Sequence, residues 1–418
     1  MTANSASFTT RFVNFVRRRT VYNLAVLARR RNHHTTYIAV TGSSTKSTTC
    51  SLLAHILKPA GSTSSRIFGN TMPTIAPFIR AVSADQDYAV IETGIDGPDR
   101  MLHLAKLIRP HVAIVTMIGL EHRKTMKSTD VVAAEKGLLV EQLAPHGIAM
   151  LNVDDVTTES IASRANGEVV TFGRDKPADY RAVAVSGNLP DYLSLQVRGP
   201  QFELDLETQM VGEHFWLPVT AAVACACHLG VPKQTIVRQV ASFVPPFGRC
   251  TPMQLPDNRL MVLDAGKAPQ HSLQLAFEMV RSASAVHKRI VLGQLSDTTG
   301  SSRNAYGRAY RLAREAADEV IFVGEHAHRH NASHDDIANG RVREFRDVRE
   351  VADYLRDTAV AGELILLKST SKLHLERAAL AQSETIICWE RNCGFKHECT
   401  RCEFYKSPRQ QPNIDQPV

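Results

Sequence analysis

A short run rich in glycine, serine and threonine, with a single lysine, carries the clearest chemical signal in this sequence. The letters TGSSTKST occupy positions 41–48, directly after the apolar stretch Tyr37–Val40 and directly before the helix-like stretch Thr49–Leu57. A loop in this position can bind phosphate, because successive backbone N–H groups and a helix N-terminus converge on the phosphate oxygens. The candidate nucleotide-binding residues of this phosphate loop are Gly42, Ser43, Ser44, Thr45, Lys46, Ser47 and Thr48.

Two side chains of the phosphate loop have the chemistry that a nucleotide requires. Lys46 would reach the terminal phosphates, and the hydroxyl of Ser47 would ligate Mg²⁺. Thr45 stands where such loops usually have glycine. Because a β-branched residue tolerates a positive φ poorly, we expect the loop to differ locally or to bind less effectively. The alternative interpretation is a polar turn with a solvated lysine, which the strand and helix on either side disfavour.

A second chemical signal is a group of four cysteines near the end of the chain. Cys388, Cys393, Cys399 and Cys402 follow the spacing C-x4-C-x5-C-x2-C. Clustered thiols in a reducing compartment usually bind metal, and four thiolates can form a tetrahedral Zn²⁺ site. An iron–sulfur cluster also takes four thiolates, and reduced cysteines without metal are the third alternative. His397 could replace one cysteine.

These signals require elements that position them, and the hydrophobic pattern supplies candidates. Short β-branched runs recur at Tyr37–Val40, Tyr88–Ile91, Val112–Ile118 and Ile148–Val153, with helix-like stretches between them. This alternation predicts βαβ units and a parallel sheet. The pattern of residues 179–207 instead predicts short antiparallel strands, and the stretch 218–229 that follows is predicted to be a helix. Beyond the break at Pro245–Gly248, strand–helix alternation resumes and predicts a second, smaller α/β domain. Its predicted strands are Leu260–Leu263, Arg289–Leu292, Val320–Val323 and Leu364–Leu367.

The amino-terminal segment predicts a basic helix at Phe8–Arg31. Its apolar residues fall near helical spacing, and arginines cluster at 17–19 and 29–31. We expect this helix to pack on the next domain. Weak contact with a membrane surface and a role as a transit peptide are the alternatives.

Composition sets limits on the class of protein. The sequence has 418 residues, of which 44% are hydrophobic and 22% are charged, as in ordinary globular proteins. No apolar run approaches the ~18 residues that cross a bilayer, so we expect no transmembrane span and a cytoplasmic location. The net charge of +7 suits anionic ligands, but no signature of nucleic-acid binding accompanies it, so we expect no nucleic-acid partner.

Further short motifs follow the phosphate loop in a fixed order along the chain. They are Glu92-Thr93-Gly94, Thr116–His122, Ala134–Gly137, Asn152–Asp155, Gly212–His214, Phe247–Arg249, Asp264 and Lys368–Ser371. In order and spacing they resemble the Mur ligase family over roughly residues 36–380, nearest to its D-alanyl-D-alanine-adding branch. The resemblance implies that Glu92, His122 and a carbamylated Lys136 hold magnesium together with Ser47. It also implies that His214 lies at the adenine, that Asp264 contacts the ribose and that Arg249 meets the terminal phosphate.

The resemblance implies a fold class and a division into domains. The fold expected is α/β, with a central P-loop parallel-sheet ATPase domain, a smaller Rossmann-like α/β C-terminal domain and a Cys-rich tail. The corresponding segments are 1–35 for the basic helix, 36–245 for the ATP-binding domain, 246–385 for the C-terminal domain and 386–418 for the tail. The separate amino-terminal domain that grips a UDP-sugar peptide is expected to be absent, because only about 35 residues precede the first strand.

The activity that the resemblance implies is ATP-dependent amide-bond formation with Mg²⁺. The γ-phosphoryl group would pass to a small-molecule carboxylate, and an amine would then attack the acyl phosphate. Lys46, Lys136 and Arg249 are the catalytic candidates, because phosphoryl transfer depends on positioning and on neutralising charge.

Departures from the family pattern favour a second interpretation. Phe215 and Pro218 replace two asparagines, and Lys368–Ser371 lacks an arginine. A degenerate, nucleotide-binding subunit that serves another protein is therefore the alternative. The Cys-rich tail, with zinc as its candidate metal and remote from the chemistry, could dock such a partner.

Overall fold

The computed structural model describes residues 8–95, 97–120, 125–298, 300–391, 393–395 and 398–405. The chain divides into two compact units. The first runs to Ser186 and adds Leu193–Gln209 and His214–Val244. The second comprises Gly187–Tyr192, Met210–Glu213 and the chain from Pro245 onward.

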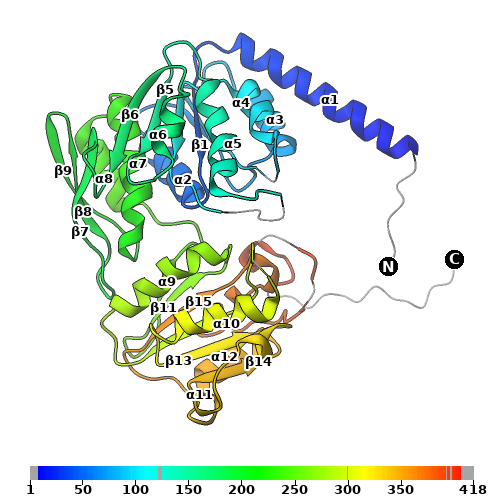
Figure 1. The fold of residues 1–418 in the computed structure, drawn as a ribbon, viewed down its shortest axis with the longest axis vertical. Helices are drawn as coiled ribbons and strands as arrows, with labels where there is room; N and C mark the ends of the chain where they lie inside the picture. Colours follow the sequence, from blue (N-terminus) through cyan, green and yellow to red (C-terminus); the bar gives the residue numbers. More distant parts are fainter. Residues whose placement is uncertain are drawn as a thin grey trace. The chain divides into compact units, whose positions relative to one another are not determined.

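The first unit is built on a nine-stranded sheet in the order β2-β3-β1-β4-β5-β6-β7-β8-β9 (Figure 1). The pairs from β2 to β7 are parallel, and the pairs β7–β8 and β8–β9 are antiparallel. The strands are β1 Thr36–Thr41, β2 Thr63–Arg66, β3 Tyr88–Glu92, β4 Val112–Val115, β5 Ile148–Asn152, β6 Glu168–Gly173, β7 Tyr180–Ser186, β8 Ser194–Gly199 and β9 Phe202–Glu207.

Helices cover both faces of this sheet (Figure 1). They are α1 Phe8–Arg31, α2 Lys46–Leu57, α3 Met72–Ala81, α4 Arg100–Ile108, α5 Thr129–Glu141, α6 Thr158–Ala162, α7 Trp216–His228 and α8 Lys233–Ser242, with a 3-10 turn, η1, at Glu213–Phe215. Helices α3, α4 and α5 pack with one side of the strands in a single apolar core. Because both faces are buried, the central strands are apolar except at their ends, as is typical of parallel strands between helices.

The carboxyl half of α1 is packed on the first unit. Ala25 is fully buried, and Val21, Tyr22 and Val26 contact the same core as α3 and α4. The buried Arg29 side chain donates from Nε to the carbonyl of Ile108 at 2.6 Å and from Nη2 to that of Arg109 at 2.8 Å. These carbonyls end α4, where a helix leaves acceptors unpaired and a cation is favourable.

The second unit contains a six-stranded sheet in the order β10-β11-β15-β12-β13-β14, in which only β10 is antiparallel to its neighbour. Its strands are β10 Thr251–Gln254, β11 Leu260–Asp264, β12 Lys288–Leu292, β13 Glu319–Val323, β14 Val342–Phe345 and β15 Leu364–Lys368. Its helices are α9 Gln270–Ser282, α10 Ser302–Ala313, α11 His334–Ala338, α12 Val348–Asp357 and α13 Glu376–Leu380, with 3-10 turns η2 Ala327–Arg329, η3 Ser371–Leu373 and η4 Cys399–Arg401.

The end of the described chain belongs to the core of the second unit. Ile386, Cys399 and Tyr405 are buried in the apolar cluster that also contains residues of β11, β15, α12 and α13. The segment after α13 is thus packed onto the domain and contributes to its interior.

The sheets confirm the predicted α/β class with two parallel-rich sheets. The predicted strands at 37–40, 88–91, 148–153, 260–263, 289–292, 320–323 and 364–367 are present with small differences at their ends, and β4 ends at Val115, before the predicted Ile118. Among the described residues, no helix combines the length and the apolar character that a bilayer span needs.

The anchor of α1 can be tested by mutation. Arg29→Ala removes the hydrogen bonds to the end of α4, so we expect the free energy of unfolding to fall by about 2–3 kcal/mol in urea denaturation. The matched control is the exposed neighbour Arg30→Ala, for which we expect a change within about 0.5 kcal/mol. Equal effects of the two substitutions would contradict the anchor.

Candidate functional site

The phosphate loop joins β1 to α2 at the carboxyl edge of the first sheet. Gly42 has a φ of 146°, and a Cβ placed on it would lie 2.0 Å from the hydroxyl oxygen of Thr116. No side chain fits in that space. Glycine is therefore required at position 42 both for the backbone conformation and for the close approach of the chain that leaves β4.

The chain that leaves β4 holds the phosphate loop in place. The hydroxyl of Thr116 donates to the Ser44 carbonyl at 2.8 Å, and the Ser43 backbone donates to the Met117 carbonyl at 2.7 Å. The Ser43 hydroxyl donates to the Gly119 carbonyl at 2.8 Å. Since these bonds occupy the polar groups of Ser43, this side chain has a bracing role in the structure.

The residue before the lysine carries the expected backbone strain. Thr45 has φ 61° and ψ −5°, the left-handed conformation, at the N-cap of α2. The threonine therefore adopts the positive φ that is unfavourable for a β-branched residue. Within the described part of the chain, its buried hydroxyl has no hydrogen-bond partner. A left-handed conformation costs a non-glycine residue about 1–2 kcal/mol.

Glu92 lies at the end of β3 beside the start of α2. Its carboxylate accepts a hydrogen bond from the Ser47 hydroxyl at 2.8 Å and from the Phe68 backbone at 3.0 Å, and its second oxygen accepts from the Asn70 amide at 3.0 Å. Burial by itself would raise the pKa of the Glu92 carboxyl, but the Lys46 ammonium and these hydrogen bonds outweigh it and hold the pKa below its usual value. The carboxylate is therefore ionised at neutral pH.

Two lysines from different helices meet at one backbone oxygen. Lys46 on α2 donates to the Gly42 carbonyl at 2.5 Å, and Lys136 on α5 donates to the same oxygen at 2.9 Å. Lys136 is fully buried and Lys46 is 7% exposed. Two neighbouring ammonium groups in a buried place repel each other and require anionic groups close by.

The oxygen atoms of this edge form a donor set that fits Mg²⁺. The Ser47 hydroxyl and the Glu92 carboxylate are in contact, and Mg²⁺ prefers hard oxygen ligands. Lys136 in its amine form does not fit a metal, whereas its carbamate would. The fourth predicted ligand, His122, lies outside the described residues.

The remaining motifs of the first unit have roles in bracing loops. The Asp155 carboxylate accepts from the Ile118 backbone at 2.5 Å, which holds the chain after β4. Asp154 accepts from the backbone of Arg174 and Lys176. His214 lies in η1 with its ring centroid 4.5 Å from that of Phe215. Thr48, on the first turn of α2, is buried.

In the second unit, the predicted residues gather at the carboxyl edge of its sheet. Asp264 ends β11 and Lys368 ends β15, and their parallel register places them opposite each other, where they form an ion pair. Lys368 also donates to the Lys267 carbonyl at 3.0 Å. A Cβ on Gly266 would lie 2.8 Å from the Arg249 guanidinium carbon, so glycine makes room for that side chain.

The four cysteines converge on a small cavity in the second unit. Cys388, Cys393, Cys399 and Cys402 line it together with His374, Arg377, Phe395 and Tyr405. His374 and Arg377 come from the segment around α13, which the cysteine spacing does not include.

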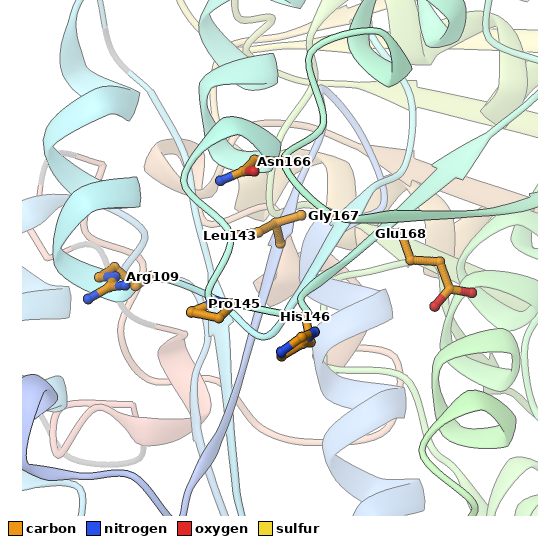
Figure 2. A pocket seen from close by; sticks show the side chains of 7 residues that line it. All are labelled: Arg109, Leu143, Pro145, His146, Asn166, Gly167 and Glu168. Carbon is orange, nitrogen blue, oxygen red and sulfur yellow. The ribbon is translucent and has the colours of Figure 1, made fainter.

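A larger cavity in the first unit does not coincide with the predicted site. It is lined by Arg109, Leu143, Pro145, His146, Asn166, Gly167 and Glu168 (Figure 2). These residues precede β4 and β5 or lie at the start of β6, so the cavity lies at the amino edge of the sheet. Ligands of open parallel sheets bind outside the carboxyl edge, which is where the phosphate loop lies.

Sequence reasoning missed several residues of these sites. Asn70 follows β2, whose sequence TSSR is polar and was not predicted as a strand. Thr116 lay inside a recognised motif but was given no role. His374, Glu376 and Arg377 lacked any spacing signal, although their place directly before the cysteine group could have prompted a search for polar partners.

Comparison with known proteins identifies relatives over most of the chain. Residues 40–226 match the model of the Mur ligase middle domain, and residues 248–370 match that of the Mur ligase, glutamate ligase domain. The UDP-N-acetylmuramate–L-alanine ligase of Anaeromyxobacter sp. is 32% identical over 61% of this chain and 53% of its own length. The UDP-N-acetylmuramoyl-tripeptide–D-alanyl-D-alanine ligase of Treponema pallidum is 25% identical over 81% of this chain and 73% of its own.

A solved structure has the same fold. MurF from Acinetobacter baumannii superimposes with a TM-score of 0.78 at 24% identity, over 88% of this chain and 81% of its own. This chain spans about half the length of the first relative and about three quarters of the second.

The strain at position 45 gives a direct test of the loop geometry. Thr45→Gly removes the steric cost of the left-handed conformation and breaks no hydrogen bond of the hydroxyl. We therefore expect the free energy of unfolding to rise by about 1 kcal/mol. Thr45→Ala is the matched control, since it keeps a Cβ and should gain less than half as much. Urea denaturation measures both. A glycine variant that is less stable than the alanine variant would show that position 45 is not strained.

Proposed function

Because the chain belongs to the Mur ligase family, we propose that it uses ATP to join a carboxylate to an amine through an acyl phosphate. The observation that carries the proposal is the convergence of Lys46, Lys136, Ser47 and Glu92 around the phosphate loop. A cytoplasmic location, where ATP and reduced cysteines are available, is part of the proposal.

The residues of the first unit have distinct roles in this proposal. Backbone N–H groups at the start of α2 bind the phosphates of ATP, and Lys46 exchanges the Gly42 carbonyl for a terminal phosphate oxygen. Ser47 and Glu92 would hold Mg²⁺, which when bound would neutralise charge on the transferring phosphoryl group. By resemblance to the family, Arg249 is proposed to supply a further positive charge, and Asp264 and His214 to contact the nucleoside.

The reaction begins with attack of the substrate carboxylate on the γ-phosphorus. ADP leaves and an acyl phosphate forms. The amine then attacks the acyl carbon, loses a proton and expels inorganic phosphate, which leaves the amide. The protein holds the reacting atoms in line and excludes water from the acyl phosphate.

Lys136 is proposed to act as its carbamate. The Lys136 ammonium first loses a proton. The resulting amine adds to CO₂, forms an N–C bond and releases a second proton, so a cation becomes an anionic oxygen ligand. The buried pair of ammonium groups at Gly42 supports this modification, because the carbamate replaces a like-charge contact with an attractive one.

A second candidate function is that of a nucleotide-binding subunit without catalysis. It is favoured by the strain at Thr45 and by Phe215 and Pro218, which are buried in place of the asparagines that the family has. The two functions differ in turnover, because a binding subunit retains nucleotide affinity and releases no phosphate.

Nucleotide binding tests the phosphate loop separately from catalysis. We expect the protein to bind the non-hydrolysable analogue Mg-AMPPNP, and Lys46→Ala to weaken binding about 10–100-fold, because a charged hydrogen bond contributes about 1.5–3 kcal/mol. Lys58→Ala, an exposed lysine just beyond the same helix, should bind as wild type does. If calorimetry finds equal affinities for all three proteins, the assignment of residues 41–48 as a phosphate-binding loop is wrong.

Turnover tests the ligase proposal. We expect phosphate release from Mg-ATP to require both a carboxylic-acid pool and an amino-acid pool, and hydroxylamine to trap the acyl phosphate as a hydroxamate. Lys136→Ala should abolish release, and formate or acetate should restore part of it by supplying a carboxylate near the metal. Nucleotide binding with no turnover on any pool would favour the binding subunit, and an active Lys136→Ala variant would refute the carbamate.

A further inference from the structure

A group of buried charges surrounds the four cysteines, and it is independent of the ligase site. His374, Glu376, Arg377 and Cys399 are each at most 5% exposed. His374 and Arg377 lie next to and within α13, and the four cysteines lie on the chain that follows it. The site therefore joins the end of the domain to the segment after it.

Arg377 is a buried cation whose acidic partners are sulfur atoms. Its Nε lies 3.1 Å from the Sγ of Cys399, and its Nη1 donates to the Glu390 carbonyl at 2.7 Å. Of the carboxylates in the described part of the chain, none forms an ion pair with it. A buried guanidinium is stabilised by negative charge close by, which a metal-bound thiolate would supply.

His374 makes contacts of the same kind. Its Nε2 lies 3.0 Å from the Sγ of Cys393, and its Nδ1 lies 3.4 Å from that of Cys399 and 3.1 Å from a Glu376 oxygen. His374 thus lies between two cysteine sulfur atoms and a carboxylate, and the ligand atoms of His374, Glu376 and Cys399 all lie within 4.8 Å of one another.

Several thiolates in one buried place are stable only if a metal ion binds them. A bound cation deprotonates its coordinating thiols. The cavity among the four cysteines has a volume of about 10 Å³. That is about the volume that one water-sized occupant needs, and a cluster of several iron and sulfide ions is much larger.

We propose that one zinc ion is bound by the thiolates of Cys388, Cys393, Cys399 and Cys402. A zinc ion with four thiolates has a net charge of −2, and the buried Arg377 guanidinium beside Cys399 offsets part of it. The site is closed to substrate, because four protein ligands complete the tetrahedral coordination of a structural zinc ion.

The zinc ion holds one wall of a second cavity. A cavity of about 950 Å³ lies at the carboxyl edge of the second sheet, and its lining includes Lys372, Leu373, Arg377, Trp389, Glu390 and Arg391. Trp389, Glu390 and Arg391 lie between Cys388 and Cys393, so binding of these two cysteines fixes the chain that forms the wall. The cysteine site is therefore next to this cavity, and Arg377 lines both.

Metal analysis of the full chain tests the proposal directly. We expect about one zinc per chain, and a colourless protein, after purification without added metal. Titration of the native protein with an organomercurial should release that zinc as the four ligand thiols react. The half-buried Cys227 is a fifth thiol open to the reagent, whereas the buried Cys50, Cys225 and Cys250 are protected. Release of iron and acid-labile sulfide would refute zinc. Four thiols that react freely with no metal released would refute the site.

Variants separate a ligand from a residue that only packs. The double substitution Cys393→Ser and Cys402→Ser should reduce zinc to about none, whereas Cys227→Ser, a half-buried thiol in the first unit, should keep about one. His374→Gln should also keep about one zinc if all four ligands are sulfur, and its loss of zinc would refute the ligand set.

Cobalt added to the wild-type apoprotein provides a readout independent of variant folding, since tetrathiolate coordination gives intense sulfur-to-cobalt absorption. Absence of that absorption would overturn the proposal.

The wall of the cavity gives a further readout. Removal of zinc from the wild type by a chelator should expose the chain around Arg391 to trypsin, with cleavage at least about tenfold faster than in the zinc-loaded protein, because the closed site no longer orders it. Equal cleavage rates would show that the metal does not hold this wall.

Discussion

The carbonyl oxygen of Gly42 is the point on which the candidate active site depends. It accepts hydrogen bonds from Lys46 and Lys136, which come from helices on different parts of the first unit. Its position is fixed by a backbone conformation that only glycine adopts easily and by Thr116, which fills the space of a side chain. The chain after β4, helix α2 and helix α5 therefore each place a side chain against Gly42. Any shift of β4 would move both lysines relative to Glu92.

Buried charge organises both sheet edges in the same way. In the first unit, Glu92 is held ionised by Lys46 and by three hydrogen bonds. In the second, Asp264 pairs with Lys368, and Arg377 faces the cysteine thiols. Since burying an unpaired charge is costly, each group constrains the identity of its neighbours. The rest of each unit is an apolar core in which a large number of substitutions of similar volume would be tolerated.

The sequence allowed the order of elements to be predicted because the central strands are apolar runs between helices. Strand β2 was missed because its residues are polar and only its pairing with β3 makes it a strand. The phosphate loop was found from its own residues, whereas Lys136 was found only through resemblance, since nothing around a helical lysine indicates that it reaches a loop 94 positions away. The cysteines were found by spacing. Their partners Arg377 and His374 were not, because a cation that faces thiols leaves no periodic signal.

The core of the second unit includes residues that are synthesised after all of its strands. Ile386, Cys399 and Tyr405 pack against α12 and α13, whereas the last strand, β15, ends at Lys368. Chains are made from the amino end, and domains fold as units during synthesis. The nascent second unit must therefore keep an apolar surface uncovered until residue 405 has left the ribosome. A chain that stops between β15 and Tyr405 would present that surface permanently to the chaperones and proteases that remove incomplete proteins.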